Sequence, residues 1–161
     1  MASEMLAGPA PVMEPVATMF TSHPIAVVRA TTVQEELPKA IQATFDRFYA
    51  VKDLDLPARG HNVVFYPDWS PTQPYVIECG VLTATSVRAH DPVVPSALPA
   101  GRVALLSHLG PYQKMHDTYV KLNDWCKREG LVRTLTFWEE YGDWSDDPAT
   151  LRTDIYLLLV P

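Results

Sequence analysis

Two short segments of this chain align without a gap: "NVVFYPDWS", residues 62–70, and "FWEEYGDWS", residues 137–145. Each begins with aromatic or β-branched residues, which favour a β-strand, and each ends in the same Asp-Trp-Ser turn. The alignment makes Tyr66 equivalent to Tyr141. An internal duplication is therefore the first hypothesis to test against the rest of the chain.

The elements around these two segments also repeat in order. Apolar residues spaced three and four positions apart predict two helices, and short apolar runs bounded by turn residues predict the strands. The predicted strands are 14–20, 24–30, 62–66, 75–85, 101–109, 134–141 and 152–160, and the predicted helices are 35–50 and 111–129. Because short links favour antiparallel pairing, the expected fold is α+β: a duplicated strand–helix–strand–strand repeat that forms one curved antiparallel sheet with two main helices.

The length of the chain, 161 residues, suits a single domain with a sizeable core. We expect residues 1–13, which are small and rich in proline, to form a flexible N-terminal tail. The domain itself is predicted to span 14–161, with repeats at about 14–90 and 91–161.

Composition narrows the range of partners. The formal net charge is −6, which argues against direct nucleic acid binding because phosphate contacts need a basic surface. No apolar run is long enough to span a bilayer, and the N-terminus lacks the basic start of a signal peptide. We therefore expect a bacterial-type cytoplasmic protein, in which Cys79 and Cys126 are reduced and structural.

The pair of glutamates in the second segment indicates where a site could lie. Alternation along a strand sends Glu139 and Tyr141 to one face and Glu140 to the other, while Val64 and Tyr66 share a face of the equivalent strand. If a pseudo-two-fold axis relates the halves, Glu139 and the two tyrosines converge. A carboxylate among aromatic rings suits an organic cation. The alternative is that Glu139 is a solvated strand residue.

Other polar residues carry weaker signals. None of the five histidines has metal-ligand spacing, and there is no nucleophile elbow or phosphate-binding glycine loop, so we predict no metal and no cofactor. Glu78, in "VIECG", is an acidic residue inside an apolar strand. We expect it at a sheet edge or facing solvent.

The combined pattern resembles a known family. "LPAGRVALLSHLGPYQKMHDTYVKLNDWCKREGL", followed by "FWEEYGDWSDDPATLRTDIYLLL", resembles the second half of a GyrI-like small-molecule-binding domain. This is also the effector-binding domain of bacterial multidrug-sensing activators. "HPIAVVRATTVQEELPKAIQATFDRFY" is similar to the first repeat of the family, and the resemblance covers about residues 14–161.

The resemblance implies a ligand cleft between the repeats, with an acidic residue, Glu139 here, that faces lipophilic cations. Tyr112 and Tyr119 lie on a helix stripe that spacing alone assigns to the core, but the resemblance brings them toward the cleft. Tyr156 shares a strand face with Asp154 and Leu158 and is included as a candidate. The predicted ligand-binding set is Glu139, Tyr141, Tyr66, Tyr112, Tyr119 and Tyr156.

The expected function is binding of a hydrophobic, cationic small molecule by a stand-alone domain that acts as a sensor or sequestering protein. Two alternatives remain open. One is a hydrolase of a reactive small molecule, in which Glu139 acts as general base. The other is a protein-interaction module such as a gyrase inhibitor, for which a protein partner would be needed.

Overall fold

The computed structural model describes residues 9–161, so most of the predicted N-terminal tail, residues 1–8, lies outside the described residues. Within 9–161 the chain forms one sheet, two α-helices and three short 3₁₀ turns. The strands are β1 (Val16–Phe20), β2 (His23–Thr32), β3 (Asn62–Tyr66), β4 (Tyr75–Leu82), β5 (Val94–Leu98), β6 (Gly101–Leu109), β7 (Arg133–Tyr141) and β8 (Arg152–Leu159), and the helices are α2 (Leu37–Tyr49) and α3 (Met115–Arg128).

The sheet is antiparallel throughout and symmetric in its strand order. The order is β1-β6-β8-β7-β3-β4-β2-β5, and exchanging each strand of the first half with its counterpart in the second half reproduces the same order in reverse. Each half contributes two strands, a helix and two further strands. The predicted fold class, a duplicated repeat forming one curved antiparallel sheet with two main helices, is confirmed.

The two halves meet where β3 pairs with β7, which we call the seam. In its register Val64 lies opposite Glu139, and Phe65 lies opposite Trp138. The sequence alignment makes Val64 and Glu139 equivalent, so at the seam each half presents the same position to the other. A local pseudo-two-fold axis therefore passes beside Glu139, which lies on one of the two middle strands of the sheet.

Two short links force the sheet to curl. Thr21 and Ser22 alone join β1 to β2, and Pro99 and Ala100 alone join β5 to β6. Each pair of strands is six positions apart in the sheet, which would be about 29 Å in a flat sheet, whereas such a link spans about 10 Å. The strand ends must therefore come together, and the Ser22 hydroxyl donates a 2.9 Å hydrogen bond to the carbonyl of Leu98.

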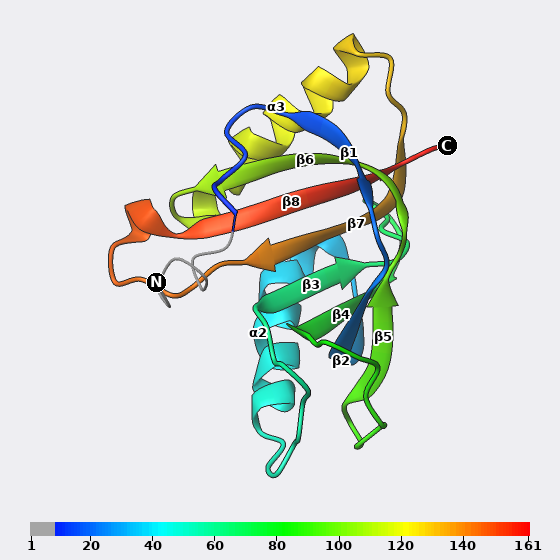
Figure 1. The fold of residues 1–161 in the computed structure, drawn as a ribbon, viewed down its shortest axis with the longest axis vertical. Helices are drawn as coiled ribbons and strands as arrows, with labels where there is room; N and C mark the ends of the chain where they lie inside the picture. The colour runs from blue at the N-terminus through cyan, green and yellow to red at the C-terminus, as the bar shows by residue number, and fades with distance from the viewer. Residues whose placement is uncertain (1–8) are drawn as a thin grey trace.

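Both helices cover the same face of the curled sheet. In Figure 1, α3 accompanies β6 and β8 in the upper half, and α2 accompanies β2, β3 and β4 in the lower half. The face under the helices carries the larger core cluster, which includes Glu139's neighbours Val64 and Ile155. The opposite face encloses a second cluster around Trp138, which is fully buried.

Strand β5 was not predicted from the sequence. Its segment contains Pro95 and follows Pro92, and proline normally argues against a strand because it cannot donate to the ladder. The structure places β5 at the edge of the sheet, where only one side of the strand needs hydrogen-bond partners. An edge position therefore tolerates the proline.

The expectation for Glu78 is wrong. Glu78 lies on β4, between β3 and β2, and only 5% of its surface is exposed. Its carboxylate accepts hydrogen bonds from Arg29 Nε at 2.8 Å and from Ser96 Oγ at 2.5 Å. Cross-strand partners therefore satisfy this acid inside the sheet, which the sequence of β4 alone could not reveal.

The segment before β1 extends the pairing with β6. Val12 and Ser107 exchange backbone and side-chain hydrogen bonds at 2.8 Å, and Arg152 donates to the carbonyl of Pro9. No helix among residues 9–161 is long and apolar enough to cross a membrane.

The close approach of β4 to β2 leaves no room for a side chain at Gly80. A Cβ atom at this position would lie 1.8 Å from the carbonyl oxygen of Ala26, so Gly80→Ala must push two central strands apart. We expect a loss of about 3 kcal/mol or more in the free energy of unfolding, measured by urea denaturation. Gly130→Ala, at a residue with φ of +70° and open space around it, should cost about 1–2 kcal/mol. Equal losses would contradict the steric argument.

Candidate functional site

The site is organised around the Glu139 carboxylate, which lies at the seam on the helix-covered face. Only 6% of the residue is exposed, and no Lys, Arg or His of residues 9–161 pairs with it. Its partners are two phenols: Tyr119 donates to Oε2, and Tyr141 donates to Oε1 at 2.5 Å. The carboxylate is therefore hydrogen-bonded on both oxygens but has no cationic partner.

Three elements bring the tyrosines to this point. Tyr141 lies two residues beyond Glu139 on β7, so strand alternation sends both to the same face. Tyr119 comes from the middle of α3, which packs over β6. Tyr66, from β3, stacks on the ring of Phe137 with centroids 4.2 Å apart and ring planes 11° from parallel.

Burial sets the protonation of the cluster. Desolvation raises the pKa of Glu139, and the hydrogen bonds from Tyr119 and Tyr141 oppose that rise only in part. Burial of their hydroxyl groups, reinforced by the charge of Glu139, raises the pKa of Tyr66, Tyr119 and Tyr141 well above the ordinary value. The three phenols therefore stay protonated and can act as hydrogen-bond donors.

Two adjoining cavities open onto this cluster, with volumes of about 370 Å³ and about 610 Å³. Both lie in the size range of small-molecule sites. The residues that line both cavities are Leu37, Tyr66, His116, Tyr119 and Glu139. The smaller cavity adds Gln34, Trp69, Val120, Asn123, Arg133 and Phe137, and the larger adds Pro38, Ile41, Gln42, Phe45, Asn62, Tyr112, Met115, Tyr141, Gly142 and Trp144.

The structure brings five of the six predicted site residues together. Glu139, Tyr66 and Tyr119 line both cavities, and Tyr112 and Tyr141 line the larger one with their rings edge to face. Tyr156 is not among them. It lies on the opposite face of the sheet, where it stacks on Trp138 with ring centroids 5.4 Å apart.

Several cavity residues were not anticipated. Leu37, Ile41 and Phe45 form an apolar stripe on α2 that packs against the larger core cluster, and these three residues also line the larger cavity. Spacing identifies an apolar face, yet it does not distinguish a packed face from one that borders a cavity. Trp144 also lines the larger cavity while 75% of its surface is exposed. The only sequence signal for Trp144 is its place in the repeated Asp-Trp-Ser turn.

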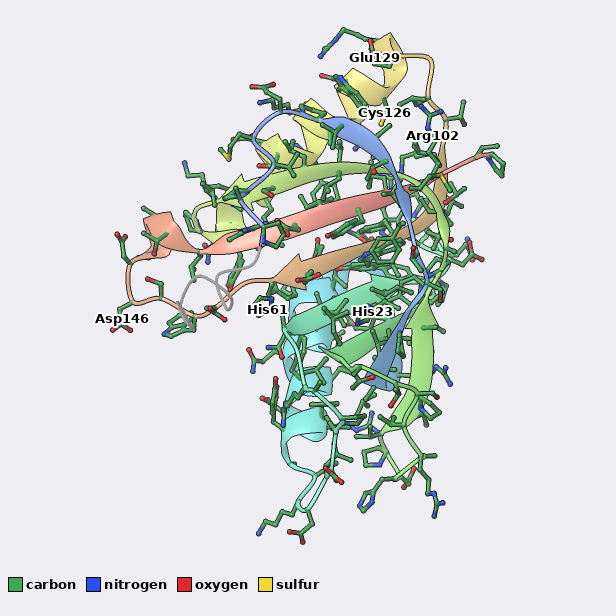
Figure 2. The ribbon with its side chains drawn as sticks, in the orientation of Figure 1. His23, His61, Arg102, Cys126, Glu129 and Asp146 are labelled. Atoms are coloured by element: carbon green, nitrogen blue, oxygen red, sulfur yellow. The ribbon has the colours of Figure 1, made fainter. Side chains whose placement is uncertain are left out.

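Glu140, the neighbour of Glu139, points to the other face, as alternation predicts. There it pairs with His61 Nδ1 at 3.2 Å, while Asp143 lies 3.0 Å from His61 Nε2. Figure 2 shows His61 beside the start of β3, facing β7. Burial of the ring lowers the pKa of His61, but the two carboxylates outweigh it and the net pKa is raised. Glu140 therefore has a partner within the chain, and Glu139 has no cationic one.

Within residues 9–161, no group of three or more His, Cys, Asp or Glu side chains is arranged to hold a metal ion. Cys79 and Cys126 are buried and unpaired, and burial raises the pKa of Cys79 to about 12, so its thiol is a poor nucleophile. The site therefore consists of a buried carboxylate in a cavity lined by aromatic side chains.

The structure thus combines a duplicated, curled eight-stranded sheet with two cavities at the seam between its halves. The sequence matches the family described as the GyrI-like small molecule binding domain over residues 13–160, and the chain belongs to this family. The family resemblance seen in the sequence is thereby confirmed.

Solved structures share this fold at low sequence identity. The C-terminal domain of EcmrR has a TM-score of 0.69 at 18% identity, covering 91% of this chain and 97% of that one. SAV2435 bound to tetraphenylphosphonium has a TM-score of 0.65 at 13% identity, covering 92% and 94%. A hydrolase from Listeria innocua has a TM-score of 0.62 at 13% identity, covering 98% of each chain.

The chain spans 57% of the length of EcmrR in the structure of its complex with DNA. No curated protein sequence matches it significantly. At these identities the structural likeness establishes the fold alone.

The desolvated carboxylate predicts how stability depends on pH. Unfolded Glu139 titrates near 4.5, and the native pKa is higher. Between those values the native state holds more protons, so the free energy of unfolding falls as pH rises. Glu139→Gln should therefore stabilise the empty protein by on the order of 1 kcal/mol at pH 8, or about 2–4 °C in Tm, and by little at pH 4.5.

Thermal melts at the two pH values test this, with Glu140→Gln as the control. That substitution removes the same charge from a residue paired with His61, so it should not stabilise the protein. If Glu139→Gln destabilises the protein at pH 8, or stabilises it equally at both pH values, burial of the ionised carboxylate does not lower the stability of the protein.

Proposed function

We propose that this domain binds a lipophilic organic cation at the seam and acts as a sensor or sequestering protein. The observation that carries the proposal is the buried Glu139 carboxylate, which has no cationic partner among residues 9–161. A buried charge without a counter-charge is costly, and proteins retain such groups mostly at functional sites. A bound cation would supply the missing charge.

The walls of the cavities fit the same class of ligand. Tyr66, Tyr112, Tyr119, Tyr141 and Trp144 present aromatic surface to the larger cavity. Ring faces attract cations through their quadrupoles, and the apolar stripe of α2 suits the hydrophobic part of such a molecule. A cation that enters would lower the pKa of Glu139 and keep it ionised.

One structural neighbour supports this ligand class. SAV2435 is a protein of the same fold whose structure holds tetraphenylphosphonium, a lipophilic cation. The low identity limits this to a guide for choosing the first ligand to test.

Hydrolysis is supported less well by the geometry. A general base must bind a proton readily in the course of the reaction. Both oxygens of Glu139 accept short hydrogen bonds from protonated tyrosines, and these hydrogen bonds act to lower the pKa of the carboxyl group. The two tyrosines therefore favour the ionised form, which suits a counter-ion better than a general base.

The matched pair of glutamates provides the test. Glu139→Gln and Glu140→Gln remove the same charge from adjacent residues that face opposite sides of the sheet. We expect Glu139→Gln to weaken binding of tetraphenylphosphonium about ten- to a hundredfold, because a buried ionic contact is lost. Glu140→Gln should stay within about twofold. Isothermal titration calorimetry measures both.

A neutral aromatic ligand of similar shape separates the contribution of charge to the affinity from the contribution of shape. Triphenylphosphine oxide should bind the wild type weakly and Glu139→Gln about equally. Equal losses of the cation in both variants would mean that position 139 has no special role. If the wild type binds no aromatic cation, the proposed function fails.

A further inference from the structure

The smaller cavity contains a second charged group, the guanidinium of Arg133. Its Cζ atom lies 5.1 Å from the centre of the Phe137 ring, and one terminal nitrogen donates to Asn123 Oδ1 at 3.0 Å. Asn123 is itself fixed by a 2.9 Å hydrogen bond to the carbonyl of Tyr119. The guanidinium is therefore held in one place at the cavity wall.

Most of the hydrogen-bonding capacity of Arg133 is unused. A guanidinium has five N–H donors, and in the described chain only Nε, to the carbonyl of Thr134 at 3.3 Å, and one N–H to Asn123 are engaged. No carboxylate of residues 9–161 pairs with it. Burial lowers the pKa of Arg133, which reflects the cost of holding this charge without a partner.

Gln34, which also lines the smaller cavity, has hydrogen-bond donors on its side-chain amide nitrogen. Its side-chain oxygen accepts from Trp69 Nε1 at 2.8 Å and from the Tyr75 hydroxyl at 2.7 Å. Because an indole N–H can only donate, this contact fixes which end of the amide is oxygen. The amide nitrogen of Gln34 therefore remains as a donor at the cavity, which it lines together with Arg133.

The two charged groups are well separated along one strand. Arg133 and Glu139 are six residues apart on β7, but the strand is irregular between Arg133 and Phe137. The residues paired with them on β8, Leu159 and Ile155, are four residues apart, about 13 Å in regular strand geometry. Both side chains reach into the same cavity. A ligand that touched both would need its charges on the order of 10 Å apart. A simple cation satisfies Glu139 alone and meets an uncompensated positive charge at Arg133.

We propose that the preferred ligand is amphoteric: an aromatic molecule with a cationic group that pairs with Glu139 and a carboxylate or similar anionic group that binds Arg133 and Gln34. This inference rests on the proposed function, since it uses the same cavity and the same role for Glu139. A carboxylate matches the fork of a guanidinium and accepts from the amide nitrogen as well. Arg133 is in this view a specificity-determining residue.

Two dyes that differ only at the acid provide the test. Rhodamine 6G is an ethyl ester that carries one positive charge, and rhodamine 19 is the corresponding free acid, a zwitterion at neutral pH. We expect the wild type to bind the free acid at least about tenfold more tightly than the ester, as measured by fluorescence anisotropy.

Arg133→Gln should abolish that preference by weakening the free acid about ten- to a hundredfold while leaving the ester unchanged or slightly tighter. Arg102→Gln is the matched control, because it removes the same charge from an exposed strand residue outside both cavities. Gln34→Glu keeps the acceptor for Trp69 and Tyr75 but replaces the donor with a negative charge. Gln34→Glu should weaken binding of the free acid and strengthen binding of the ester.

The outcomes separate the two proposals. If both dyes bind equally to the wild type, or if Arg133→Gln weakens both equally while remaining folded, the amphoteric ligand is ruled out and the cation site stands. If neither dye nor tetraphenylphosphonium binds, the proposed function itself fails. Should Arg133→Gln not fold, the preference of the wild type and its reversal in Gln34→Glu decide the question.

Discussion

The architecture depends on a closure constraint. Two links of two residues each must connect strands that lie six positions apart in the sheet, so the sheet has to curl until its ends meet. In this order β3 and β7 lie side by side at the centre, while β1 pairs with β6 and β5 pairs with β2, so strands of the two halves also meet near both edges. The helices that follow β2 and β6 lie on one face (Figure 1). Residues of both helices and of β3 and β7 line the two adjoining cavities.

At the pseudo-two-fold axis, equivalent residues of the two repeats lie next to each other, so the side chains at that position must be compatible as neighbours. Val64 and Glu139 occupy equivalent positions and lie opposite each other across the seam. Two carboxylates in this position would repel each other in a buried environment, and two valines would leave no charge. The repeats differ at this pair, so the axis carries a single carboxylate. The equivalent residues Tyr66 and Tyr141 both remain phenols that face the same space.

Four acidic residues lie on strands of the sheet, and their partners distinguish structural from functional roles. Glu140 pairs with His61 at 3.2 Å. Glu78 pairs with Arg29 at 2.8 Å, and Asp154 pairs with Arg152 at 3.0 Å, both on the face away from the helices. Glu139 has only tyrosine hydroxyls. A buried acid with an internal counter-charge is complete as it stands, whereas one that has only neutral donors is stabilised further when a cation arrives. Arg133, which lines the smaller cavity with Glu139, shows the complementary arrangement, as a cation with unused hydrogen-bond donors.

The sequence by itself determined the element types, the duplication and the face on which Glu139 lies, because these depend on local periodicity and on strand alternation. It also determined that Val64 and Glu139 are equivalent, but not that they are neighbours. The tertiary structure alone decided four features: strand β5, the buried pairing of Glu78, the position of Tyr156 on the opposite face, and the placement of Gln34 and Arg133 at the same cavity. Each depends on which strand lies beside which, and that order follows from closure of the whole sheet, a constraint that no local window of sequence contains.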